Sequence, residues 1–251
     1  MSITVFFAAG AANWRDYKDA LTDAFRTARL DVTLSDAASD PAAVDYIVFA
    51  PGGIITDFTP YRNAKAVLNL WAGVERLVTN RTLTQPLARM VNHELTEGMV
   101  EYVVGHVLRH HLGMDAHIHG QDGVWRNDTL PPLARERTVA VLGLGELGAA
   151  SARALASLNF RVIGWSRSQK DIVGIACLSG EHGLDQALAR AEIVVLLMPL
   201  TADTTDMIDA RRLAGMKRGV VIINPGRGAL IDDAALLAAL DAGQVGHATL
   251  D

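Results

Sequence analysis

The feature that most constrains the fold is the regular alternation of apolar runs and helical segments from Thr138 to the end of the sequence. The apolar runs, among them "TVAVLG", "EIVVLLMP" and "GVVIINPG", are almost continuous in Val, Ile and Leu. Continuous apolar strands separated by helices are typical of a parallel sheet covered on both faces. We therefore predict an α/β fold whose main part is a doubly wound parallel sheet of the Rossmann type.

A smaller, flavodoxin-like α/β domain is predicted before it. The segments "ITVFFAA", "YIVFAP", "AVLNLWA" and "PLARMV" have the pattern of short buried strands, and "NWRDYKDALTDAFRTARL" that of an amphipathic helix. A long helix, "TEGMVEYVVGHVLRHHL", then leads away from this layer. We place the boundary so that residues 1–92 form the smaller domain and residues 93–251 form the larger one, with the linking helix at its start.

Composition excludes several classes of function. The net charge is −5, with no run of Lys or Arg, so we expect neither a nucleic-acid partner nor a membrane partner. The apolar runs are far shorter than the roughly 20 residues of a membrane span. Cys177 is the only cysteine, which rules out an intramolecular disulfide, and we expect it to be a small core residue. These features indicate a cytoplasmic protein.

The sequence "VAVLGLGELGAAS" contains the sharpest local signal. Gly143, Gly145 and Gly148 form G-x-G-x-x-G directly after an apolar strand and at the start of a helix. In that context the glycines permit a tight turn, close approach of a pyrophosphate and close helix packing, and the amides of Glu146 and Leu147 face the phosphates. We predict a dinucleotide site here; the alternative is a Gly-rich turn in an ordinary α/β fold.

The end of the next strand, "RVIGWSRSQK", bears on the choice of cofactor. NAD-binding folds carry an acid there for the ribose hydroxyls, whereas this sequence has Ser166, Arg167, Ser168 and Lys170. A guanidinium and two hydroxyls can hydrogen-bond a 2′-phosphate that a carboxylate would repel. The sequence therefore favours NADP(H) over NAD(H), unless Arg167 is simply a solvated surface residue.

Another candidate site residue is presented by "INPGRGALIDD". A strand ends at Asn224, a Pro-Gly turn follows, and Arg227 stands between two glycines. Ligands of open α/β sheets bind at the carboxyl edge, where this turn would lie. An arginine there can pair with a substrate carboxylate through two hydrogen bonds.

Taken in order and spacing, "GLGELG", "WSRS", "LLMPLTADTTDMI", "INPGRGALID" and "HATLD" resemble the D-isomer-specific 2-hydroxyacid dehydrogenases. Within that family, "WSRS" and "LWAGVERLV" are most similar to the glyoxylate/hydroxypyruvate reductases. The resemblance extends from about Ala66 to Asp251. Before Ala66 only the strand-helix pattern matches.

The resemblance implies roles for individual residues. Arg227 would be catalytic, binding the 2-oxoacid carboxylate and polarising the carbonyl, and the backbone at Ala72 and Gly73 would bind the same carboxylate. Residues 1–92 would then be the substrate-binding domain. Further cofactor contacts would come from Met198, Pro199, Thr204 and Asp251, the last near the nicotinamide carboxamide. Family members are usually homodimers, so we expect a homodimer.

In the family, the strand ending in "LD" continues into a segment with a glutamate, a proton-donating histidine and a helix that returns to the first domain. The given sequence stops at Asp251, so we expect either a longer polypeptide or a truncated one, in which residues 1–92 lack this return segment. A positioned acid contributes roughly 10²- to 10⁴-fold in rate. Without it we expect cofactor binding with little turnover.

Five histidines cluster at the end of the linking helix: His106, His110, His111, His117 and His119. We interpret them as solvated residues of a helix end and a connector, because no carboxylate or cysteine nearby in the sequence completes a ligand set. We therefore expect no metal, although a replacement acid or a metal site stays open as an alternative. His93 and His247 are given no role. Trp71 and Trp125 are interpreted as packing anchors, with Trp71 beside the substrate pocket.

The leading hypothesis is NADPH-dependent reduction of a small 2-oxoacid, glyoxylate or hydroxypyruvate, to the 2-hydroxyacid. Two alternatives stay open. One is a non-catalytic dinucleotide sensor of the same fold, against which the placement of Arg227 argues. The other is an NAD-linked dehydrogenase of bulkier 2-hydroxyacids, which tighter binding of NADH would favour.

Overall fold

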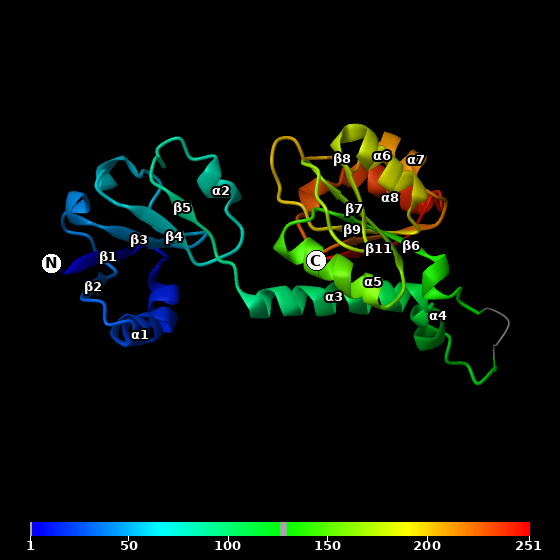
Figure 1. Ribbon diagram of the computed structural model, residues 1–251, viewed down its shortest axis with the longest axis horizontal. Coiled ribbons are helices and arrows are strands. Elements are labelled where there is room, and N and C mark those ends of the chain that lie inside the picture. Colours follow the sequence, from blue (N-terminus) through cyan, green and yellow to red (C-terminus); the bar gives the residue numbers. More distant parts are fainter. Residues whose placement is uncertain (1, 126–129) are drawn as a thin grey trace. The chain divides into compact units, whose positions relative to one another are not determined.

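The computed structural model describes residues 2–125 and 130–251. The chain divides into two compact units, Met1–Asn92 and His93–Asp251. Both are parallel α/β units (Figure 1). No helix within the described ranges has the length and apolar character needed to cross a membrane.

The first unit contains a five-stranded parallel sheet in the order β2-β1-β3-β4-β5. This is the strand order of flavodoxin-like folds, as predicted. The strands are β1 (Ile3–Phe7), β2 (Val32–Ser35), β3 (Tyr46–Phe49), β4 (Ala66–Asn69) and β5 (Leu87–Ala88), and the helices are α1 (Ala11–Thr27) and α2 (Glu75–Val78). Short 3₁₀ turns lie at Pro41–Ala43 and Thr59–Tyr61.

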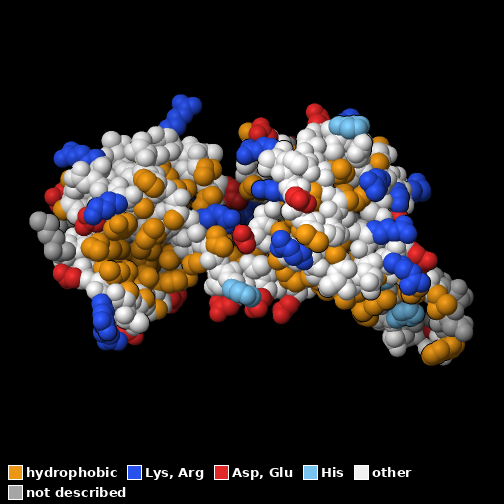
Figure 2. Space-filling view, in the orientation of Figure 1, with side chains coloured by type: hydrophobic (Ala, Val, Ile, Leu, Met, Phe, Trp, Pro, Cys, Tyr) orange, Lys and Arg blue, Asp and Glu red, His pale blue; other side chains and the backbone are white. Residues whose placement is uncertain are grey.

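Alternation along the strands gives this sheet two apolar faces. Phe6, Ile47 and Val67 pack with buried Phe58 and Leu77 on one face. On the other face, strand residues pack against the aromatic side of α1, which buries none of its own residues completely. That face is therefore only partly covered, and Figure 2 shows hydrophobic side chains at the surface over these elements.

The second unit contains a six-stranded parallel sheet in the order β11-β10-β9-β6-β7-β8. Counted from β6, this is the order 3-2-1-4-5-6 of the Rossmann fold, so the predicted fold is confirmed. The strands are β6 (Thr138–Leu142), β7 (Arg161–Ser166), β8 (Ala176–Ser179), β9 (Ile193–Leu196), β10 (Val220–Asn224) and β11 (Val245–Leu250).

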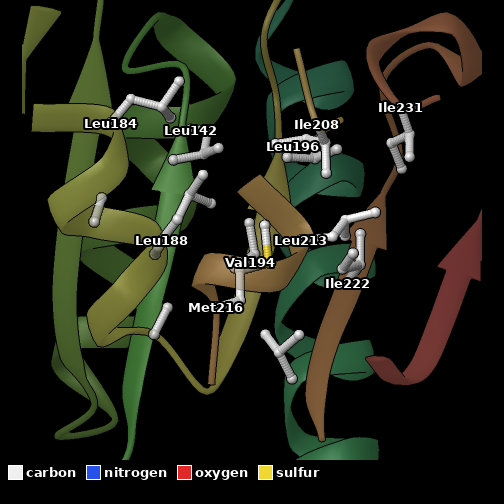
Figure 3. Packing of buried hydrophobic residues seen from close by; sticks show 14 of the residues in the cluster. Leu142, Leu184, Leu188, Val194, Leu196, Ile208, Leu213, Met216, Ile222 and Ile231 are labelled. Atoms are coloured by element: carbon white, nitrogen blue, oxygen red, sulfur yellow. The ribbon is translucent and has the colours of Figure 1, made fainter. Parts of the chain in front are cut away.

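Helices cover both faces of the second sheet. The helices are α3 (His93–His111), α4 (Met114–His119), α5 (Glu146–Ser157), α6 (Gly180–Arg190), α7 (Ala210–Gly215) and α8 (Asp233–Asp241), with 3₁₀ turns at Ala134–Glu136 and Gly228–Leu230. One core cluster joins the sheet to α3 and α5, and the other joins it to α6, α7 and α8. In the latter, Leu142, Val194 and Ile222 of three adjacent strands meet Leu184 and Leu213 of the helices (Figure 3).

Candidate functional site

The turn between β6 and α5 has the shape that its three glycines allow. Gly143 has a φ of +102°, and a Cβ there would lie 2.6 Å from the carbonyl oxygen of Leu197. A Cβ on Gly148 would lie 1.7 Å from the carbonyl oxygen of Gly143, so any larger residue would push the helix off the strand. A Cβ on Gly145 would meet nothing within 4 Å. Two of the glycines therefore serve packing, and the third leaves open space beside the backbone.

The first turn of α5 borders that open space. Gly145 is the N-cap residue, and no described side chain caps the helix there. The first amides of a helix have no partner within the helix, so those of Glu146, Leu147 and Gly148 are available to an external acceptor. Together with the positive end of the helix dipole they suit a pyrophosphate. The turn therefore fits the dinucleotide predicted from the sequence.

The end of β7 presents the residues predicted for the cofactor ribose. Ser166 is buried, and its hydroxyl donates to the carbonyl oxygen of Ser168 at 2.8 Å, which fixes the turn. Arg167, Ser168 and Lys170 are exposed. Ser166 is thus a residue that shapes the turn, whereas the guanidinium of Arg167 and the hydroxyl of Ser168 are left on the surface beside it.

The segment after β9 combines packing and loop-forming residues. Met198 is buried in the core, and Pro199 is exposed. The Thr204 hydroxyl donates to the carbonyl oxygen of Pro199 at 2.7 Å and accepts from the amide of Thr201 at 2.7 Å. Thr204 therefore holds this loop in shape.

The turn after β10 is built around a buried asparagine. The Asn224 side chain accepts from the amide of Gly226 at 3.1 Å and donates to the carbonyl oxygen of Arg227 at 2.9 Å. Arg227 itself is exposed, and its guanidinium donates to the carbonyl oxygen of Gly226 at 3.1 Å. The side chain of Asn224 thereby fixes the backbone from which Arg227 projects.

Asp251 follows β11 beside this turn. Its amide donates to the carbonyl oxygen of Asn224 at 3.2 Å, which continues the pairing of β10 with β11. Burial, and then the charge of Asp251, raise the pKa of Tyr102 on α3. Asp251 therefore lies beside the Arg227 turn, with its carboxylate near Tyr102 in the middle of α3.

These turns lie at one edge of one sheet, because all six strands are parallel. The carbonyl oxygen of Leu197, next to the end of β9, lies at the Gly143 turn, and that of Leu196 would lie 3.1 Å from a Cβ on Gly226. The Gly143 turn and the Arg227 turn therefore flank the end of β9. Strands β6 and β9 are also where the strand order reverses, which is the position where ligands of open α/β sheets bind.

In the first unit, the loop after β4 contains Ala72 and Gly73. The Asn69 side chain is buried and donates to the carbonyl oxygens of Trp71 at 2.7 Å and Gly73 at 2.8 Å. Its own oxygen is buried and has no hydrogen-bond partner among the described residues. Asn69 therefore shapes the predicted carboxylate-binding loop, as Asn224 shapes the Arg227 turn.

Sequence reasoning missed Asn69 and Asn224. The available signal was their position: each is the last residue of a strand and precedes a loop assigned to the substrate. A polar side chain that ends an apolar strand and is itself buried needs hydrogen-bond partners, and the nearest are the backbone groups of the following loop.

Three interpretations of single residues need correction. Trp125 is 88% exposed and Trp71 is 48% exposed, so neither is a packing anchor within the described structure. Cys177 is only partly buried, at the side of the core. The histidines at the end of the linking helix are not all solvated, because His111 is 5% exposed and His110 is half-buried, whereas His117 and His119 are exposed. The ring of His110 also lies 5.3 Å, between centroids, from that of His247.

Comparison with known families identifies the second unit. The family described as "D-isomer specific 2-hydroxyacid dehydrogenase, NAD binding domain" matches residues 103–251. This range contains both the Gly143 turn and Arg227.

Individual relatives extend the similarity. Glyoxylate/hydroxypyruvate reductase A of Yersinia enterocolitica serotype O:8 / biotype 1B is 34% identical over 196 residues, which cover 74% of this chain and 62% of the relative. The matched part is thus less than two thirds of that curated protein.

Solved structures match the whole chain. A D-isomer specific 2-hydroxyacid dehydrogenase from Xanthobacter autotrophicus Py2, in complex with NADPH and MES, has a TM-score of 0.90 and 38% identity, covering 100% of this chain and 81% of that one. An NADPH-dependent glyoxylate/hydroxypyruvate reductase from Sinorhizobium meliloti, in complex with NADP and sulfate, has a TM-score of 0.83 and 32% identity over the same shares. This chain belongs to the D-isomer specific 2-hydroxyacid dehydrogenase family.

Proposed function

We propose that this protein binds NADP(H) and reduces a small 2-oxoacid, glyoxylate or hydroxypyruvate, to the 2-hydroxyacid. The observation that carries the proposal is the placement of an anion-binding helix start and an exposed arginine on either side of the end of β9. One suits the pyrophosphate of a dinucleotide, and the other suits the carboxylate of an acid.

The preference for NADP(H) rests on the end of β7. The guanidinium of Arg167 and the hydroxyl of Ser168 are exposed there, and no Asp or Glu lies between Ser166 and Lys170. A 2′-phosphate could hydrogen-bond both side chains, and no carboxylate would repel it. The two solved relatives described above, which contain NADPH and NADP, support the same choice.

Substrate binding is assigned to two loops, each shaped by a buried asparagine. Arg227 would hold the 2-oxoacid carboxylate by two charge-assisted hydrogen bonds and draw electron density from the neighbouring carbonyl. The backbone at Ala72 and Gly73, held by Asn69, would supply amides to the same carboxylate. The first unit would then be the substrate-binding domain and the second the cofactor-binding domain.

When bound, NADPH supplies the hydride. The chain's own residues hold the reactants: the start of α5 fixes the pyrophosphate, and Met198, Pro199 and Thr204 form the segment along which the cofactor would lie. Asp251 would accept a hydrogen bond from the nicotinamide carboxamide. Arg227 stabilises the negative charge that develops on the substrate oxygen as hydride arrives.

The test is the oxidation of NADPH by the purified protein with glyoxylate and with hydroxypyruvate. We expect turnover from the natural full-length protein, and we expect R227A in that protein to lose substrate turnover while it keeps NADPH binding. R218A is the matched control, because Arg218 is an exposed arginine in the turn before β10 that hydrogen-bonds Ala242. NADPH binding without turnover in the wild type would favour a sensor, and turnover unaffected by R227A would contradict the proposed role of Arg227.

A second copy of this chain is the proposed partner. Apolar side chains around α4 and in the segment after it are exposed, among them Ile118 at 60%, Val124 at 63% and Trp125 at 88%. Figure 2 shows hydrophobic side chains gathered at this end of the second unit. Large apolar residues that are exposed in one part of a unit are typical of a protein–protein interface, so we propose a homodimer formed through them.

A further inference from the structure

Three metal-ligating side chains meet beside the end of α3, away from the Gly143 and Arg227 turns. His110 comes from α3, Asp115 from α4 and His247 from the edge strand β11. One potential ligand atom from each lies within 4.8 Å of the others. His247 pairs with Val221 near the start of β10, whereas the predicted cofactor and substrate residues follow the strands' carboxyl ends.

Neighbouring residues fix this group in place. The Thr249 hydroxyl and Nε2 of His110 are hydrogen-bonded at 2.9 Å. Arg109 donates from Nε to Oδ1 of Asp115 at 2.7 Å, which orients the carboxylate and leaves its other oxygen for a further ligand. Outer contacts of this kind commonly hold the ligands of metal sites in position.

We propose that His110, Asp115 and His247 bind a divalent transition-metal ion, of which Zn²⁺ is the representative case. Two imidazoles and one carboxylate form a mixed nitrogen and oxygen set that suits Zn²⁺, Co²⁺ or Ni²⁺ and does not suit Mg²⁺, which prefers oxygen ligands alone. Ligand bonds of about 2.0–2.2 Å require the three side chains to close further around the ion, with water completing the shell.

The ion would join two consecutive helices to a strand that is distant in the sequence. It would tie the end of α3 and the short helix α4 to the edge strand β11, close to the apolar residues proposed for the dimer. The site is structural, and it does not depend on the proposed reductase activity.

Binding of Zn²⁺ and Co²⁺ to the purified, tag-free protein tests the proposal. We expect one equivalent of each ion to bind, a visible Co²⁺ spectrum of low-coordinate nitrogen and oxygen ligation, and a rise in Tm with Zn²⁺ but not with Mg²⁺. H247A and D115N should each weaken Zn²⁺ binding at least about tenfold and abolish the rise in Tm.

H182A is the matched control, because His182 is an exposed histidine of the same unit that hydrogen-bonds Gln186 and lies outside the cluster. It should bind Zn²⁺ as the wild type does. Because His247 is exposed, H247A should fold, and NADPH binding by each variant checks this independently. The proposal fails if the wild type binds no Zn²⁺, or if H247A and D115N bind it with unchanged affinity.

Discussion

At the residue scale, the two loops assigned to the substrate share one construction. In each, an asparagine at the end of a strand is buried and returns its side chain to the backbone of the loop that follows. The Asn224 amide bonds one donor and one acceptor of its loop, and the Asn69 amide bonds two acceptors, which an apolar residue cannot do. The conformation of both loops therefore depends on one side chain each.

Replacing Asn224 by alanine tests this dependence. Asn224 is 2% exposed and makes two hydrogen bonds, so N224A should lower the free energy of unfolding by about 1–3 kcal/mol and reduce substrate turnover through misplacement of Arg227. Urea unfolding and turnover measurements check both effects. N63A is the control, because Asn63 makes one exposed hydrogen bond to Ala42 and should cost less than about 0.5 kcal/mol. Equal losses in the two variants would contradict the account of Asn224.

The glycines of the turn after β6 should differ in the effect of adding a methyl group. G145A should fold with nearly wild-type stability, because its Cβ enters open space, yet it should bind NADPH more weakly because that space is the proposed pyrophosphate site. G148A should lose both stability and binding, since its Cβ would lie 1.7 Å from the Gly143 carbonyl oxygen. Thermal unfolding combined with NADPH titration separates the two cases. Normal NADPH binding by G145A would place the pyrophosphate elsewhere.

At the element scale, the sequence predicted the central strands better than the peripheral elements. Strands β6, β7, β9 and β10 are apolar and almost entirely buried, so their pattern is unambiguous. Strands β2 and β8 and helices α2 and α4 were not predicted. They have four to six residues each, and few of those residues are fully buried, so their apolar pattern is too short and too weak to predict them.

Part of the candidate site was also predictable from the sequence, and part of it was not. The glycine turn and Arg227 have a recognisable spacing, whereas the roles of Asn69 and Asn224 depend on which backbone groups the fold brings within reach. The group of His110, Asp115 and His247 also required the fold, because β11 supplies its third member from far along the chain.

A cluster of charged residues joins helices α6 and α7, and its contribution to the stability of the folded state should depend on pH. Asp185 accepts hydrogen bonds from Arg211 and Arg212, and the bond from Arg211 is the main reason that the pKa of Asp185 lies below its ordinary value of 3.8. A lowered pKa in the folded state means that the stabilisation is present above pH 3.8 and is lost as the pH falls below it.

D185N should therefore be less stable than the wild type at neutral pH, by at most about 1 kcal/mol because the side chain is 40% exposed. The difference should shrink as the pH falls below 3.8. Denaturant unfolding at several pH values measures it, and D171N, at an exposed aspartate of the same unit, serves as the control. A difference that grows in acid would contradict the sign of this argument.

At the scale of the whole molecule, the exposed apolar residues around α4 predict self-association. Replacing Trp125 by serine should shift the protein from dimer to monomer, because it removes the most exposed aromatic side chain of the proposed interface. V173S is the matched control, since Val173 is 98% exposed and lies outside that group. Sedimentation or light scattering gives the mass. A monomeric wild type, or equal effects of the two substitutions, would contradict the proposed interface.

We propose that the second unit holds NADP(H) through the start of α5 and the end of β7. The most direct measurement is a fluorescence titration of the wild type, R167A and R190A with NADPH and with NADH, where Arg190 is an exposed arginine at the end of α6. We expect the wild type to bind NADPH more tightly than NADH. We further expect R167A to bind NADPH on the order of tenfold more weakly and NADH as tightly as the wild type does. R190A should bind both cofactors as the wild type does. Tighter binding of NADH, or an R167A variant that keeps the wild-type preference, would contradict it.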